Sequence, residues 1–131
     1  MEILGINHIN IVVTSEQLPG VVAFYEQVLG LKQGPRAISK RNGAWLYCHD
    51  TAIIHLSVVE EQPKVEGNAH FNHVALACSN VEKSLGILNS HNITYTADYR
   101  SSPEMSQLFF HDPVGIRIEL NFPGEKIDLP G

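Results

Sequence analysis

Residues 6–13 read Ile-Asn-His-Ile-Asn-Ile-Val-Val, and residues 71–78 read Phe-Asn-His-Val-Ala-Leu-Ala-Cys. Both stretches carry an Asn-His pair at the same place, followed by an apolar run that is typical of a strand buried largely on both faces. The second stretch begins about 65 residues after the first, and self-similarity at a fixed spacing indicates a repeated structural unit. We therefore expect the chain to contain one module twice.

The segments after these two strands are also repeated. Thr14 and Gln17 have counterparts in Ser79 and Glu82, and a hydroxyl residue followed three places later by Gln or Glu predicts a helix start. Two turns are marked as well, a hairpin at Asn42-Gly43 and a type I turn at Asp112-Pro113-Val114-Gly115. After each helix we expect three strands, at 31–39, 44–49 and 52–58 in the first half and at 94–98, 107–111 and 116–122 in the second.

This order predicts an α+β protein made of two βαβββ modules. Each module is small for independent folding, so we expect the two to pair through their sheets into one core, which makes the chain a single domain over 1–131. The tail carries two prolines and two glycines, and we expect it to be poorly ordered. The expected parts are a first module at 3–58, a charged linker at 59–68, a second module at 69–122 and the tail at 123–131.

Composition excludes several classes of function. The formal net charge of −5 disfavours nucleic-acid binding, which needs a surplus of Lys and Arg. Apolar runs such as 11–13 are far too short to span a membrane, and Met1-Glu2-Ile3 lacks the basic start of a signal peptide. Cys48 and Cys78 have no metal-type spacing, and with two thiols and no export signal we expect a cytoplasmic protein.

Polar side chains in the first and last strand of each half are the main functional signal. Because strand residues alternate between faces, parity separates His55 from the apolar face of its strand, and it separates Glu119 in the same way. His8 and His73 occupy equivalent positions in the two opening strands. The duplicated pattern thus selects four residues, His8, His55, His73 and Glu119.

These four residues form a plausible ligand set for one divalent cation. A half-buried carboxylate is costly unless it is paired or bound to a metal, and three imidazoles with one carboxylate suit Zn, Fe, Ni, Co or Mn. A single histidine in such a strand is more often a hydrogen-bonded core residue than a ligand. Four equivalent positions in a duplicated unit favour joint metal binding instead.

Several longer motifs resemble the vicinal oxygen chelate superfamily, over residues 3–122. They are the Asn-His strands, Val-Ala-Phe-Tyr-Glu-Gln-Val-Leu-Gly-Leu at 22–31, and Phe-Phe-His-Asp-Pro-Val-Gly-Ile-Arg-Ile-Glu-Leu at 109–120. That group includes glyoxalase I, extradiol dioxygenases, methylmalonyl-CoA epimerase, and the fosfomycin and bleomycin resistance proteins. The resemblance implies paired modules that form a curved mixed sheet around a cavity, the glyoxalase/bleomycin resistance/dioxygenase fold. It also implies a ligand in the first and last strand of each module, which falls on the same four residues.

The resemblance leaves three functions open. In a glyoxalase I-like isomerase or lyase, Glu119 is both a ligand and the base that moves a proton next to a carbonyl. Here His55 replaces the usual Glu or Gln, and no glutathione-binding arginines can be located. In an extradiol-type dioxygenase, His8, His73 and Glu119 form an iron triad and His55 is an acid or base, but Phe109 stands where that signature has Tyr. A metal-free drug-binding resistance protein generally lacks the ligands that are present here.

Other residues are candidates for contacts with the small-molecule substrate. Trp45 and Tyr47 share a strand face and could line the cavity, although an aromatic stripe is as often plain core. Residues 99–105 are expected to form a lid-like loop, from which Arg100 could meet an anionic substrate. A homodimer is expected, and the metal site could form within one chain or across two. The catalytic candidates are Glu119 and His55.

Overall fold

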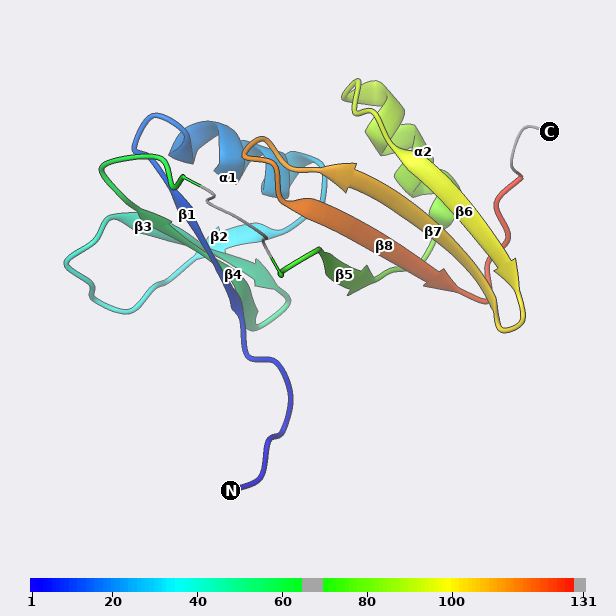
Figure 1. Cartoon of the computed structure of the whole chain (residues 1–131), viewed down its shortest axis with the longest axis horizontal. Coiled ribbons are helices and arrows are strands. Elements are labelled where there is room, and N and C mark those ends of the chain that lie inside the picture. The colour runs from blue at the N-terminus through cyan, green and yellow to red at the C-terminus, as the bar shows by residue number, and fades with distance from the viewer. Residues whose placement is uncertain (65–69, 129–131) are drawn as a thin grey trace. The chain divides into compact units, whose positions relative to one another are not determined.

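The computed structural model describes residues 1–64 and 70–128 and divides the chain into two compact units, Met1–Glu66 and Gly67–Gly131. Each unit has the element order βαβββ that the repeat predicted (Figure 1). Residues 65–68 of the predicted linker, residue 69 at the start of the predicted second module, and residues 129–131 of the predicted tail lie outside the described residues. Among the described residues, no helix combines the length and apolar character needed to cross a membrane.

The first unit is a four-stranded mixed sheet with one helix. Its sheet has the strand order β1-β4-β3-β2, in which only the β1–β4 pair is parallel. The helix connects β1 to β2 along the chain. The elements are β1 (Ile9–Val13), α1 (Leu18–Gln27), β2 (Lys32–Gly34), β3 (Gly43–Cys48) and β4 (Thr51–Val58).

The second unit repeats this arrangement. Its sheet has the order β5-β8-β7-β6, and again only the pair formed by the first and last strands, β5 and β8, is parallel. The predicted α+β class and the two modules with mixed sheets are thus confirmed. The elements are β5 (Val74–Ala77), α2 (Val81–Ser90), β6 (Thr96–Ser101), β7 (Glu104–His111) and β8 (Arg117–Pro123).

Each core lies on one face of its sheet. In the first unit, Ile54 and Leu56 of β4 are almost fully buried, as is Tyr25 of α1. Ile118 and Phe122 of β8 play the same part in the second unit. β1 alternates between more buried and exposed positions, and β5 alternates between half-buried and exposed ones, so the prediction that the opening strands are buried on both faces was wrong. The opposite face of each sheet is free to carry polar side chains.

The helix starts differ in how they are capped. Thr14 and Gln17 exchange the two predicted hydrogen bonds, Thr14 N to Gln17 Oε1 at 3.0 Å and Gln17 N to Thr14 Oγ1 at 3.3 Å. In α2 the predicted pair of Ser79 and Glu82 is replaced. Asn80 is the cap and accepts from Lys83 N, because its left-handed backbone brings its side chain over the first turn.

Three local predictions were wrong. Asn42-Gly43 is not a hairpin turn, since β2 ends at Gly34 and a loop joins it to β3, whereas the two-residue turn lies at 49–50 between β3 and β4. Residues 99–105 are not a loop, because β6 and β7 form a hairpin around a tight turn at Ser102 and Pro103. The described tail is ordered: Ile127 is 5% exposed, and its N–H donates to Ser106 Oγ at 2.8 Å.

Candidate functional site

In the first unit, two of the predicted ligands lie together. His55 is on β4 and points away from the core, while His8 directly precedes β1, the neighbouring strand. The two imidazole rings are nearly parallel, with centroids 3.8 Å apart and an angle of 11° between their planes. Trp45, opposite His55 on β3, stacks on the other face of His55 at 4.0 Å. The His55 ring is therefore packed between the rings of His8 and Trp45.

Hydrogen bonds indicate which nitrogen of each ring carries the proton in this pair and which has an available lone pair. His8 Nδ1 lies 2.8 Å from Asn7 Oδ1, an acceptor, so Nδ1 carries the proton and the lone pair of Nε2 is available. His55 Nε2 donates to the carbonyl oxygen of Ala52 at 3.1 Å, which leaves the lone pair on Nδ1. Burial lowers the pKa of His55, and the charge of a protonated His8 lowers it further. The neutral imidazole, which is the metal-binding form, is thereby favoured.

The second unit brings the other two predicted ligands together. His73 Nε2 lies 2.8 Å from Glu119 Oε2, and Glu119 is 7% exposed. His73 Nδ1 faces Asn72 Oδ1 at 2.7 Å, so the Asn-His geometry of the first unit is repeated. The residues before β1 and β5 therefore hold their histidines through Nδ1 in the same way. The contact with the last strand differs, because His73 meets Glu119 through Nε2 whereas His8 stacks on the His55 ring.

Glu119 has a second partner that the sequence reasoning missed. Gln107 on β7 donates through Nε2 to Glu119 Oε1 at 2.6 Å and to Asn121 Oδ1 at 3.0 Å. Both amide hydrogens are used, which fixes the orientation of the Gln107 side chain. The signal that could have found it is a polar residue next to the apolar run of residues 108–110.

A further polar contact links Arg117 to this cluster. Arg117 Nη1 donates to Asn72 Oδ1 at 3.0 Å, the same oxygen that accepts from His73. Arg117 lies two residues before Glu119 on β8, so the two side chains share a face of the sheet.

Each unit by itself supplies two metal-type ligands. Among the described residues no group of three or more His, Cys, Asp or Glu side chains is arranged to hold a metal ion. The pairs are His8 with His55 and His73 with Glu119. The residue types fit a divalent cation, because imidazole nitrogens and a carboxylate are ligands that such ions take. Each Asn-His bond is of the kind that orients a ligating histidine.

The three predicted substrate contacts lie at different places. Trp45 stacks on His55, as described above. The Tyr47 hydroxyl donates to the carbonyl oxygen of Pro35, at the loop between β2 and β3. Arg100 lies on β6, with its side chain 62% exposed and its Nε 3.8 Å from Asp98 Oδ2. Trp45 is thus the one of the three that contacts a predicted ligand.

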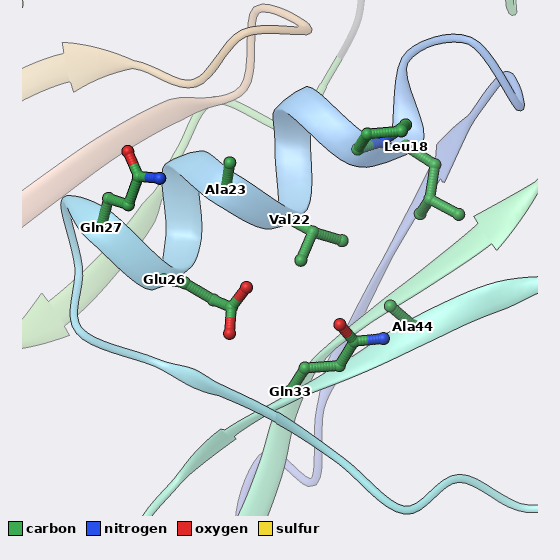
Figure 2. Close-up of a pocket in the computed structure, with 8 residues that line it drawn as sticks. Leu18, Val22, Ala23, Glu26, Gln27, Gln33 and Ala44 are labelled. Atoms are coloured by element: carbon green, nitrogen blue, oxygen red, sulfur yellow. The ribbon is translucent and has the colours of Figure 1, made fainter.

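The first unit also contains a pocket of about 480 Å³ between α1 and the edge of its sheet (Figure 2). Glu26 extends from the helix toward Gln33 of β2 in this view. Ala44, which also lines the pocket, is on the core side of β3, so the pocket opens on the face opposite to Trp45 and His55. The lining residues are Leu18, Pro19, Val22, Ala23, Glu26, Gln27, Gln33 and Ala44.

Comparison with known proteins agrees with this architecture. A sequence model of the Glyoxalase/Bleomycin resistance protein/Dioxygenase superfamily matches residues 5–120. Glyoxylase I 4 of Arabidopsis thaliana is 30% identical, over 92% of this chain and 71% of that protein. The chain therefore belongs to this superfamily, the vicinal oxygen chelate group.

Two crystal structures illustrate the likeness of fold. A glyoxalase/dioxygenase from Nostoc punctiforme has a TM-score of 0.76 at 18% identity, over 93% of this chain and 92% of that one. The fosfomycin resistance protein FosX from Listeria monocytogenes, complexed with Mn(II) and a dihydroxypropylphosphonic acid, has a TM-score of 0.70 at 17% identity. That match covers 93% of this chain and 94% of FosX. At these identities the likeness concerns the fold.

Proposed function

We propose that the protein is a divalent-metal-dependent enzyme of the glyoxalase I type, an isomerase or lyase. Its substrate is a small oxygenated molecule whose neighbouring oxygens chelate the cation. The proposed ligands are His8, His55, His73 and Glu119, two from each unit. The proposal extends to a cytoplasmic homodimer with one domain per chain.

One observation supports the proposal: both units bring together residues from the same two positions of the repeat, although the contact is ring stacking in one unit and a histidine–carboxylate pair in the other. In each, a histidine that follows an asparagine meets a ligand-type side chain of the last strand, His55 in one unit and Glu119 in the other. The Asn Oδ1 to His Nδ1 distances are 2.8 and 2.7 Å. A duplicated unit that keeps this arrangement in both copies supports a joint role better than two unrelated core contacts would.

The proposed reaction gives Glu119 and His55 different roles. A bound divalent cation would act as a Lewis acid on the substrate oxygens. Glu119 is the proposed base, because its Oε2 faces the candidate site while Gln107 holds its Oε1 at 2.6 Å. Oε2 accepts the proton next to the carbonyl and returns it at the neighbouring carbon. His55, kept neutral, serves as a ligand and is the second catalytic candidate.

Elemental analysis of protein purified without added metal tests the proposal. We expect zinc, nickel, cobalt or manganese near one equivalent per chain. In D2O, small α-hydroxyketones should then gain deuterium at the carbon next to the carbonyl, measured by proton NMR. Iron together with oxygen uptake on a catechol would indicate the dioxygenase reaction instead. Protein that retains no metal, and binds none when titrated, would refute the proposal and favour a metal-free binding protein.

A further inference from the structure

Arg117 is held rigidly on the same sheet face as Glu119. Its guanidinium carbon lies 4.7 Å from the centre of the Phe109 ring, within the range of a cation–π contact. Nη1 donates to Asn72 Oδ1 at 3.0 Å. The side chain is half-buried. Two independent contacts therefore fix the plane of the guanidinium, and the remaining N–H groups of the fork keep their hydrogens for other acceptors.

This guanidinium has no anionic partner among the described residues of its own unit. No carboxylate there lies within 4.0 Å of it, although the protein as a whole is acidic, with a formal net charge of −5. Arg100 in the same unit provides a contrast, because it is exposed and lies near Asp98. The half-buried Arg117 side chain is suited to bind an anion, because its guanidinium is already oriented and no carboxylate in the described part of its unit neutralises its charge. A planar guanidinium binds carboxylate or phosphonate oxygens in pairs.

Arg117 is also connected to the proposed ligands. Asn72 Oδ1 accepts from both Arg117 and His73, so the arginine and the histidine are oriented by one shared atom. Two residues along a strand separate Cα atoms by about 7 Å, which is the span between Arg117 and Glu119. One small molecule could place an oxyanion at Arg117 and another oxygen beside Glu119.

We propose that Arg117 is the anion-binding element of this site and that the substrate carries an oxyanion, a carboxylate or a phosphonate or phosphate group, close to the oxygens that chelate the cation. This inference deepens the proposed function and rests on it for the role of the cation. Phe109 and Asn72 are positioning residues. The Phe109 ring stacks against the guanidinium of Arg117, and Asn72 Oδ1 holds the orientation of that guanidinium by a hydrogen bond.

Anion binding can be tested without any metal. Metal-free, ¹⁵N-labelled protein is titrated at low ionic strength with sodium phosphate, methylphosphonate and acetate, and amide shifts are followed by NMR. We expect saturable shifts confined to residues around Arg117, Asn72 and Phe109. The most tightly bound probe identifies which oxyanion is preferred. Absence of saturable binding by all three anions would overturn the inference.

Two substitutions of equal charge sharpen this test. Arg117→Met should weaken binding by about tenfold or more, because a charge-assisted contact is lost. Lys83→Met removes the same charge from an exposed position on α2 of the same unit and should leave binding unchanged. Arg117→Lys keeps the charge but not the fork and should bind at an intermediate strength. If Arg117→Met does not fold, Phe109→Leu, which removes only the ring, serves as the second variant and should also weaken binding.

The results separate this inference from the proposed function. If the protein retains no cation but binds anions in a way that depends on Arg117, the anion site is upheld and the metal-dependent function is refuted. A cation bound with full affinity by a protein that ignores all three anions would do the reverse. Equal loss of anion binding in Arg117→Met and Lys83→Met would show a general charge effect and contradict the assignment to Arg117.

Discussion

Glu119 is the residue on which the proposed chemistry depends most. It is 7% exposed, and both of its oxygens are engaged, Oε1 by Gln107 and Oε2 by His73. Ionised carboxylates are rarely buried unless they are paired or bound to a metal. Gln107 and His73 satisfy this requirement through the contacts described above. His73 and Glu119 are the residues of this unit that would hold a cation, which would supply the positive charge in place of a protonated imidazole.

Glu119→Gln should remove the base and one anionic ligand while keeping the shape of the side chain. We expect deuterium exchange into an α-hydroxyketone to be lost and the affinity for the cation to fall by at least about tenfold. The melting temperature of the metal-free protein should change little. Glu104→Gln is the matched control, since it removes an exposed carboxylate from the adjacent strand β7. Unchanged exchange and metal retention in Glu119→Gln would refute the assigned role.

At the scale of the residue, the sequence predicted which strand face carries the polar side chains better than it predicted the partners of those side chains. Parity along a strand is a local property, and it was sufficient to separate His55 and Glu119 from the apolar faces. The role of Gln107 depends on which residue lies across from it. Asn121 faces it through the register of β7 with β8, and Glu119 lies two residues from Asn121 on the same face. Strand register depends on the whole sheet, so this partner could not be predicted from the pattern alone.

The start of α2 is stabilised from outside the helix. Glu125, which follows β8, accepts through Oε1 from Asn80 N and through Oε2 from Val81 N, both at 2.7 Å. These are amide hydrogens that a helix leaves without partners, and a carboxylate there also interacts favourably with the helix dipole. Prolines and glycines in the tail suggested disorder, but this long-range contact orders it. A pattern that considers only neighbours in sequence misses such contacts.

Glu125→Ala should therefore lower the free energy of unfolding by about 1–2 kcal/mol, through the loss of charge-assisted hydrogen bonds. Glu82→Ala removes the acid that the sequence had suggested as part of a capping box and should cost at most about 0.5 kcal/mol, because only a dipole interaction is lost. Urea unfolding of both variants measures the difference. Equal destabilisation would show that Glu125 is not the dominant cap.

Gly43 and Gly86 differ in the space available for a side chain. A Cβ added at Gly43 on β3 would lie 2.0 Å from the backbone oxygen of Leu56, whereas one at Gly86 on α2 meets no atom within 4 Å. Gly43 is thus required by close approach of β4. The Asn-Gly signal pointed to a hairpin at this position because the local pattern does not contain the neighbouring strand.

Gly43→Ala should destabilise the protein by about 1–3 kcal/mol, as strands β3 and β4 are forced apart. Gly86→Ala should stabilise it by about 0.5–1 kcal/mol, because alanine is the better helix former. Thermal unfolding measured side by side checks both signs. Stabilisation by Gly43→Ala would mean that the tight contact is absent in solution.

In the whole molecule, the duplication of the fold is more exact than the duplication of the chemistry. The repeat in the sequence predicted two copies of one element order, and both copies are found. The ligand pairs have diverged, however, into two stacked imidazoles in one unit and a histidine–carboxylate pair in the other. With one carboxylate and three neutral histidines, a bound divalent cation would leave a net positive charge, which suits an anionic substrate next to Arg117.

The central claim is that the two pairs serve one cation. Calorimetric titration of metal-free protein with Zn(II) or Mn(II), on wild type, His8→Ala and His73→Ala, tests it most directly, because the two substitutions occupy equivalent positions in the two units. The account predicts one cation per chain in the wild type and a loss of affinity of at least about tenfold in each variant. Wild-type binding in either variant, or two cations per chain of which each variant loses only one, would contradict it.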